Sequence, residues 1–174
     1  MKQRRQGLSG DLLDELGDGD GGHFVLPRST TRIVRQPGDG TCLFHSLAYG
    51  LVGKSGRRLR QDICEYIERH PRLSIAGEPL RKWVQWASGR DVWSYASHMR
   101  SRSAWGGGIE LVVFVRKYKR NVHVYEKVRG GYKRISRFNT KNAAEDGTTT
   151  FHLLYSGRAH YDVLVPMSGA NGRY

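Results

Sequence analysis

Hydrophobic and polar residues follow two different periods along the chain, one typical of helices and one typical of strands. Residues 57–70 place Leu59, Ile63 and Ile67 at helical spacing, and this pattern stops before Pro71. The spacing therefore predicts a helix over these residues. Comparable patterns predict four more helices, over residues 42–52, 79–87, 91–99 and 109–118.

The C-terminal third of the chain changes to a period of two. There Val122 and Val124 occupy one side of an extended segment, while His123 and Tyr125 occupy the other. Strands are predicted at residues 24–26, 31–34, 121–126, 132–138, 150–155 and 161–165. Helices thus dominate the first part and consecutive strands the last, which favours an α+β fold with a largely antiparallel sheet.

The composition is that of a folded protein with one domain. Its 174 residues are the length of an ordinary domain, and 38% hydrophobic with 10% aromatic residues exclude a wholly disordered chain. No apolar run approaches the roughly 20 residues that a membrane-spanning helix needs. The first residues do not lead into the apolar stretch of a secretory signal, so we expect an intracellular protein, in the cytoplasm or the nucleus.

The two ends of the chain differ from the middle. Residues 17–22 read Gly-Asp-Gly-Asp-Gly-Gly, which is too rich in glycine and too poor in apolar side chains to pack. We expect residues 1–22 to form a flexible tail, residues 23–168 the folded domain, and residues 169–174 a short C-terminal tail. The flanking helices and the bidentate glutamate of a calcium loop are missing, so no metal site is predicted.

The formal net charge is +13, from 29 Lys and Arg against 16 Asp and Glu. Residues 1–40 are neutral, so the whole excess lies in residues 41–174. Such an excess favours an anionic partner, either nucleic acid or an anionic lipid surface. One hypothesis is therefore a basic nucleic-acid-binding module without protease activity, with Tyr118, Tyr125 and Tyr132 available to stack on bases. The simpler alternative is a solvated basic face.

Two cysteines, Cys42 and Cys64, are too few for a zinc site. A disulfide between them is possible, but a chain without an export signal is expected to keep both reduced. Cys42 follows a turn at residues 37–40 and begins an apolar helix, where partial positive charge and unpaired N–H groups favour a thiolate and receive an oxyanion. Cys42 is therefore a candidate nucleophile, with a small buried hydrophobic residue as the alternative. Cys64, in mid-helix beside Ile63, is expected to fill the core.

A nucleophilic cysteine needs a base, usually a histidine held by a carboxylate or an amide. His160 and Asp162 lie at the start of the last predicted strand, and positions two apart share a face of a strand. The two side chains are therefore expected to lie side by side, as a base and the group that orients it. This pair is a weak motif on its own, because a surface ion pair would have the same sequence.

Residues 105–110 read Trp-Gly-Gly-Gly-Ile-Glu. Glycines permit a close approach of the backbone or a positive φ, and Trp105 offers a flat apolar surface beside them. Trp105, Gly106 and Gly107 would suit an extended substrate tail with little side-chain bulk. The alternative is a glycine-rich loop that begins a helix beside a buried tryptophan.

Three blocks, taken in order, resemble the ovarian tumour (OTU) family of cysteine proteases: residues 39–44 (Asp-Gly-Thr-Cys-Leu-Phe), residues 105–110 and residues 160–162 (His-Tyr-Asp). The resemblance covers about residues 33–166. It implies a papain-like α+β fold, with helices packed on a small, largely antiparallel sheet. It also implies a thiol-dependent deubiquitinase, which cleaves the isopeptide or peptide bond after the C-terminal glycine of ubiquitin or a ubiquitin-like modifier.

The same resemblance implies roles for single residues. Cys42 would be the nucleophile, His160 the general base and later the acid, and Asp162 the group that orients His160. Asp39 would be a further active-site residue. The backbone of Asp39, Gly40 and Cys42 would shape the oxyanion hole, and the site would need no cofactor or metal.

Further expectations concern the substrate. Trp105, Gly106 and Gly107 would line the channel for its tail, and Glu110 would anchor a helix. The reaction would form a thioester on Cys42 and then hydrolyse it. The expected partners are ubiquitin or a ubiquitin-like modifier and its conjugates, with a second, anionic partner on the basic surface as an open question. A chain from a pathogen would act in the host cytosol.

Overall fold

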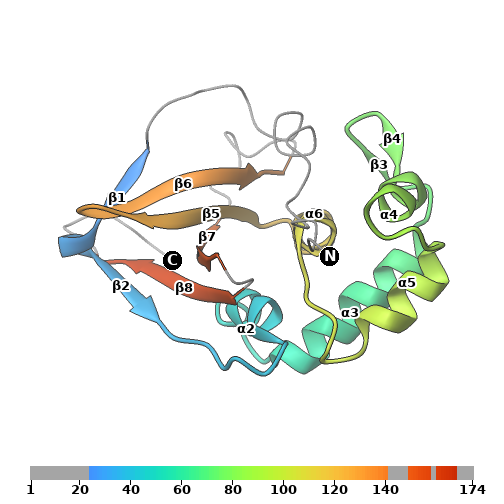
Figure 1. Cartoon of the computed structure of the whole chain (residues 1–174), viewed down its shortest axis with the longest axis horizontal. Coiled ribbons are helices and arrows are strands. Elements are labelled where there is room, and N and C mark those ends of the chain that lie inside the picture. Colours follow the sequence, from blue (N-terminus) through green and yellow to red (C-terminus); the bar gives the residue numbers. More distant parts are fainter. Residues whose placement is uncertain (1–23, 141–148, 158–159, 168–174) are drawn as a thin grey trace, which may run out of the picture.

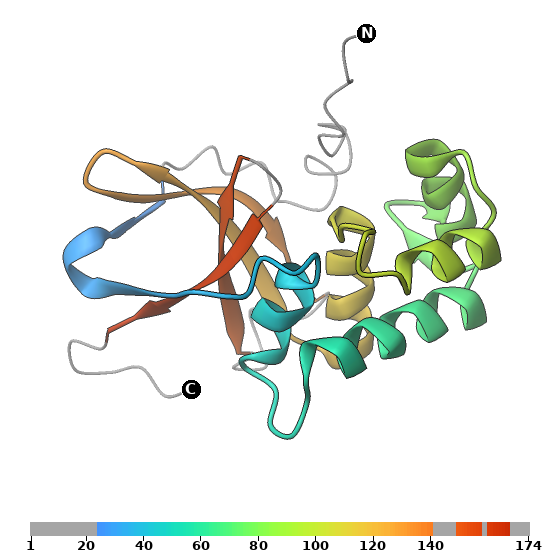
Figure 2. The ribbon, with the colours of Figure 1, turned by 60° about the horizontal axis from the view of Figure 1, so that its bottom comes forward.

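The computed structural model describes residues 24–140, 149–157 and 160–167. Helices form one lobe and strands the other, and helices α2 (Cys42–Ala48) and α6 (Gly108–Tyr118) pack where the two lobes meet (Figures 1 and 2). The two tails expected at residues 1–22 and 169–174 lie outside the described residues.

The rest of the helical lobe consists of α3 (Gly56–Arg69), α4 (Leu80–Ser88) and α5 (Val92–Met99). Helix α3 buries the stripe of Leu59, Ile63 and Ile67, as its spacing predicts. Helix α2 ends at Ala48, four residues earlier than predicted, and a turn that contains Gly53 at φ +72° leads on to α3. Glycine adopts this left-handed conformation at little cost, so Gly53 lets the chain turn toward α3.

The sheet has six strands: β1 (Val25–Pro27), β2 (Thr31–Val34), β5 (Asn121–Val128), β6 (Gly131–Phe138), β7 (Thr150–Ser156) and β8 (His160–Pro166). Their order is β1-β6-β5-β7-β8-β2, with β5 and β7 parallel and every other neighbouring pair antiparallel. Strands β1 and β2 occupy opposite edges, yet only the 3₁₀ turn Arg28–Thr30 separates them. Because three residues span at most about 10 Å, the sheet must curl until its edges approach (Figure 2).

Each face of the curled sheet covers its own hydrophobic cluster. The larger cluster lies between the sheet and the helices, and it includes Val122 and Val124 of β5. The smaller cluster consists of Leu26, Tyr125, Tyr132, Leu154 and Leu164, with Ile33 packed against it. Both sides of β5 are therefore buried, although its alternating pattern on its own does not distinguish a buried second face from an exposed one.

The second cluster overturns one expectation from the sequence. Tyr125 and Tyr132 are buried within it, so neither is available to stack on nucleic-acid bases. Tyr118 is half-buried, and its hydroxyl donates a hydrogen bond to Asp62 at 3.0 Å. The prediction of a stacking surface made of these three tyrosines is therefore wrong.

A small hairpin was not predicted. Its strands, β3 (Ser74–Ile75) and β4 (Glu78–Pro79), have two residues each and are too short to produce a visible pattern. Ala76 and Gly77 both have positive φ, as a tight hairpin turn requires. None of the helices in the described ranges combines the length and the apolar character needed to cross a membrane.

Candidate active site

Cys42 is the first residue of α2 and is 8% exposed. It follows a tight turn at residues 39–41, the active-site turn, in which Asp39 Oδ1 accepts a hydrogen bond from the Thr41 N–H at 2.9 Å. Gly40 has φ +79°, and a Cβ added there would lie 1.8 Å from the carbonyl oxygen of Arg102. Only glycine fits this position, so the turn delivers Cys42 to the helix start in one defined way.

Helix α2 packs against strand β8. Ser46, one helical turn after Cys42, donates from Oγ to the carbonyl oxygen of Tyr161 at 3.1 Å. Tyr161 follows His160, the first residue of β8. This contact therefore holds the Cys42 helix beside the end of the strand that carries the candidate base, as both ribbon views show (Figures 1 and 2).

His160 and Asp162 lie side by side, as positions two apart on a strand should. The distance between His160 Nε2 and Asp162 Oδ1 is 3.0 Å. Asp162 has no exposed surface, while the His160 side chain is 30% exposed. When Nε2 donates its proton to the carboxylate, the lone pair of the neutral imidazole lies on Nδ1, so the carboxylate selects the tautomer.

Two residues that the sequence analysis did not identify hold Asp162. Oδ1 accepts the backbone N–H of Gln36 at 2.8 Å, and Oδ2 accepts from Arg35 Nη1 at 2.8 Å. Burial alone would raise the pKa of Asp162, but the hydrogen bonds from Gln36, His160 and Arg35 outweigh it and hold this pKa below its usual range. The sequence alone does not reveal these two partners of Asp162, because their position depends on the register of β2 against β8, which pairs Val34 with Val163.

Asp39 lies in the active-site turn, and its described contacts do not include His160. Besides the Thr41 N–H, it approaches His45, whose Nε2 is 3.3 Å from Asp39 Oδ2. The hydrogen bond from the Thr41 N–H is the largest cause that lowers the pKa of Asp39, and His45 adds to it. In this geometry Asp39 shapes the turn, whereas Asp162 is the carboxylate in contact with His160.

The glycine-rich block lies against the active-site helix. A Cβ added at Gly106 would lie 2.7 Å from Leu43 Cδ2 and 3.2 Å from the Phe44 ring, whereas one added at Gly107 would meet nothing within 4 Å. Trp105 is 56% exposed, so it is not the buried tryptophan of the alternative interpretation. Of the two glycines, only Gly106 lies so close to α2 that a larger residue would clash.

Glu110 anchors α6, as expected. Its Oε2 accepts the Gly107 N–H at 2.8 Å, and its Oε1 accepts the Tyr95 hydroxyl at 2.7 Å. Glu110 is 1% exposed, and burial raises its pKa. The side chain therefore joins the start of α6 to α5 and fixes the backbone of the glycine-rich block.

The second cysteine has a different environment. Cys64 is fully buried in mid-helix, and burial raises the pKa of its thiol to about 12, which disfavours a thiolate. No disulfide joins it to Cys42. Within the described ranges, no group of three or more His, Cys, Asp or Glu side chains is arranged to hold a metal ion. A thiol at a helix start, together with a histidine oriented by a buried carboxylate, is suited to nucleophilic attack on a carbonyl carbon.

Comparisons with known proteins agree with this chemistry. A family model described as OTU-like cysteine protease matches residues 37–161. The chain is 28% identical over 142 residues to the ovarian tumor domain-containing deubiquitinating enzyme 4 of Arabidopsis thaliana, covering 76% of this chain and 43% of that protein. It is 27% identical over 137 residues to the RNA-directed RNA polymerase L of Crimean-Congo hemorrhagic fever virus, covering 76% of this chain and 3% of that protein. The chain therefore spans less than half the length of either relative.

Solved structures share the fold. The Hazara virus OTU bound to ubiquitin has a TM-score of 0.65 and 22% identity, covering 84% of this chain and 88% of that one. The viral OTU domain protease from Taggert virus has a TM-score of 0.64 and 22% identity, covering 87% and 88%. These likenesses confirm the papain-like α+β fold that the three sequence blocks implied. Because the family model matches most of its length, the chain belongs to the OTU-like cysteine protease family.

Proposed function

We propose that this protein is a cysteine-type deubiquitinase that hydrolyses the bond after the C-terminal glycine of ubiquitin or a ubiquitin-like modifier. The observation that carries the proposal is the His160–Asp162 pair at the start of β8, beside the helix that Cys42 begins. The Arabidopsis relative is named a deubiquitinating enzyme. OTU domains from Hazara virus and from Wolbachia pipientis have been solved bound to ubiquitin, which supports the same substrate class.

In the proposed first step, Cys42 attacks the carbonyl carbon of the modifier's terminal glycine. His160 takes the thiol proton on Nδ1, while its Nε2–H stays hydrogen-bonded to Asp162. The negative charge that develops on the carbonyl oxygen is received by backbone N–H groups at the start of α2, including that of Cys42. The C–N bond then breaks, His160 protonates the leaving amine, and a thioester remains.

In the second step His160, neutral again after it has protonated the amine, is once more the base: it takes a proton from a water molecule whose oxygen attacks the thioester carbon. The C–S bond breaks, the protonated His160 returns its proton to the Cys42 thiolate, and the modifier leaves with a carboxyl group that ionises in water. Cys42 and His160 are then ready for the next substrate, with no cofactor consumed.

We propose that Trp105, Gly106 and Gly107 line the channel for the modifier's tail. Gly106 packs on α2, so this block lies next to the helix that carries the nucleophile. The exposed Trp105 ring and the open space at Gly107 leave room for an extended chain without bulky side chains.

A ubiquitin probe with an electrophile in place of its C-terminal carboxylate tests the function. We expect wild-type protein to form a covalent adduct at Cys42, and Cys42→Ala to form none. Cys64→Ala is the matched control, because the Cys64 thiol is fully buried and its raised pKa disfavours a thiolate, and it should label like wild type. Labelling that persists in Cys42→Ala, or that never occurs in wild type with any modifier probe, would refute the proposal.

The choice of modifier is a separate question. Probes built on ubiquitin and on ubiquitin-like proteins, followed by a panel of di-ubiquitins, distinguish the modifier and the chain linkage. We also propose an intracellular site of action, in the cytoplasm or the nucleus, because a catalytic thiol must stay reduced.

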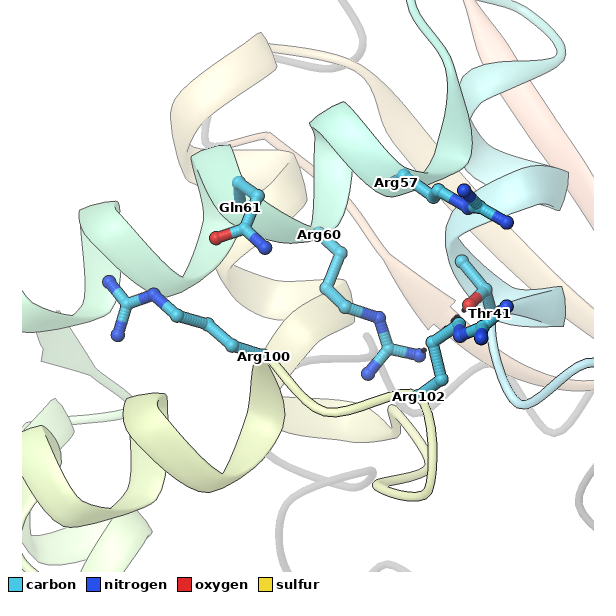
Figure 3. Close-up of a pocket in the computed structure, with 6 residues that line it drawn as sticks. All are labelled: Thr41, Arg57, Arg60, Gln61, Arg100 and Arg102. Carbon is cyan, nitrogen blue, oxygen red and sulfur yellow. Dashed lines mark hydrogen bonds between the residues drawn. The ribbon is translucent and has the colours of Figure 1, made fainter.

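A second candidate function concerns the positive charge. A pocket of about 250 Å³ lies behind the active-site turn, lined by Thr41, Arg57, Arg60, Gln61, Arg100 and Arg102 (Figure 3). Arg100 forms an ion pair with Glu68, but Arg57 and Arg102 have no ion-pair partner among the described residues. We propose that this pocket binds a phosphate group of an anionic partner.

A further inference from the structure

Arg60 carries its guanidinium group into the interior behind the active-site turn. It lies on α3 and is only 2% exposed, and its side chain extends toward Thr41, whereas the Arg100 side chain points the other way (Figure 3). Nη1 of Arg60 shares its two hydrogens among three backbone carbonyls of the segment at the end of α5, those of Met99 at 2.7 Å, Ser101 at 2.7 Å and Ala104 at 2.9 Å. This charge is therefore committed to backbone atoms rather than to solvent.

The other terminal nitrogen of Arg60 reaches the active-site turn. Nη2 donates to the carbonyl oxygen of Gly40 at 2.5 Å and lies 3.5 Å from Thr41 Oγ1. The guanidinium also lies over the ring of Phe44, 4.4 Å from its centre. One side chain thus joins α3, residues 99–104 and the turn that leads into the catalytic helix.

A single peptide unit in the turn is held at both ends. The Gly40 carbonyl and the Thr41 N–H belong to the same planar peptide group. Arg60 binds the carbonyl, and Asp39 Oδ1 accepts from the N–H at 2.9 Å. Rotation of this plane would break both hydrogen bonds at once.

The next peptide unit contains the Cys42 N–H. Its carbonyl, that of Thr41, accepts a hydrogen bond from the His45 N–H at 2.9 Å in the first turn of α2. The direction of the Cys42 N–H therefore depends on the helix after it and on the peptide plane before it. Arg60 and Asp39 fix that preceding plane.

We propose that Arg60 is a positioning residue of the active site, which aims the Cys42 backbone N–H at the developing oxyanion by holding the Gly40–Thr41 peptide. The proposal rests on the proposed protease function and extends it to a residue that touches neither substrate nor thiol. A misaimed donor weakens the transition state more than the bound substrate, so the loss should fall on kcat rather than on KM.

Arg60→Lys is the main test. Lysine keeps the charge, but a single ammonium group cannot serve two segments on different sides as the guanidinium fork does. We expect kcat for a fluorogenic ubiquitin substrate to fall about 10²-fold with little change in KM. Arg58→Lys is the matched control, since Arg58 lies on the same helix but forms its ion pair with Asp62, at 3.1 Å, rather than reaching the active-site turn, so its kcat should stay near wild type.

Asp39→Ala keeps the test decisive if Arg60→Lys does not fold. Asp39 is exposed, so this variant should unfold at nearly the wild-type temperature. It removes the hydrogen bond from the Thr41 N–H, at the other end of the Gly40–Thr41 peptide, and should therefore also lower kcat. The two substitutions together should lower kcat by less than the product of their separate effects. A folded Arg60→Lys with wild-type kcat, or an Asp39→Ala with wild-type kcat, overturns the positioning role. Wild-type protein that neither labels with modifier probes nor hydrolyses them refutes the proposed function instead.

Discussion

Asp162 shows how one buried carboxylate is made to orient a histidine. Its Oδ1 accepts from both the Gln36 N–H and His160 Nε2, and its Oδ2 accepts from Arg35, whose side chain is 74% exposed. The two donors at Oδ1 have fixed positions, because His160 lies on β8 and Gln36 closely follows β2. The donor at Oδ2, Arg35, has an exposed side chain. The two oxygens are therefore not equivalent, and this asymmetry leads to a prediction.

Asp162→Asn should retain far more activity than Asp162→Ala. The Gln36 N–H requires an acceptor at Oδ1, so the asparagine oxygen should take that place and still accept from His160, while its amide faces only the movable Arg35. We expect Asp162→Ala to lower kcat/KM by about 10²-fold, and Asp162→Asn by about 10-fold or less, the difference between a hydrogen bond to a charged and to a neutral acceptor. Steady-state hydrolysis of a ubiquitin substrate measures both. If the two variants were equally impaired, the negative charge rather than the orientation would be what the site requires.

Prediction from the sequence succeeded for residues whose relation is local. His160 and Asp162 are two positions apart on a strand, and Cys42 follows its turn directly, so spacing alone placed them. Arg35 and Asp162, by contrast, are 127 positions apart. Arg60 contacts Gly40 across 20 positions and Ala104 across 44. Such contacts depend on strand register and helix packing, which no local pattern contains.

At the scale of elements, the same distinction holds. The helices and strands were placed within a few residues because each buries a periodic apolar face, as α3 does with Ile63 and Ile67. The parallel pairing of β5 with β7 was not predicted, because pairing is a relation between elements rather than a property of one. The early end of α2 was missed because the apolar Leu51 and Val52 continue the pattern after the helix has stopped.

Gly106 and Gly107 form a matched pair that separates packing from substrate binding. Gly106→Ala pushes a methyl group against Leu43 and Phe44 of α2, so we expect unfolding free energy to fall by about 1–3 kcal/mol. Gly107→Ala meets open space and should leave thermal stability unchanged. If the block lines the substrate channel as proposed, Gly107→Ala should nevertheless raise KM for a ubiquitin substrate. An unchanged KM in a fully folded Gly107→Ala would remove this glycine from the channel.

At the scale of the whole molecule, the net charge of +13 is distributed rather than concentrated in the catalytic group. The residues proposed for chemistry include two carboxylates, Asp39 and Asp162, and the aromatic residues suggested for base stacking are largely in a core. The excess of positive charge therefore does not indicate which reaction the protein catalyses. Arg57 and Arg102, behind the active-site turn, pair with no acidic side chain in the described ranges, and the proposed binding of an anion in this pocket depends on these two cations.

This surface is tested by two charge-matched double variants. Arg57→Gln with Arg102→Gln removes two arginines of the pocket that pair with no acidic side chain among the described residues. Lys127→Gln with Arg129→Gln removes the same charge at the β5–β6 turn, at the far end of the sheet lobe (Figure 1). We expect pyrophosphate at ten times its Kd to stabilise wild type and the second variant by about 1.4 kcal/mol, and to have little effect on the first.

A second measurement distinguishes a nucleic-acid phosphate from a lipid phosphate. The binding of a short RNA and of anionic vesicles is measured for the same three proteins over a series of salt concentrations. A partner that uses the pocket should lose affinity mainly in the variant that lacks Arg57 and Arg102, and the loss should shrink as salt screens the charges. Equal losses in both variants would show that only net charge matters. In that case, or if wild type binds no phosphate-bearing ligand, the pocket is not an anion site and the positive charge is a solvated face.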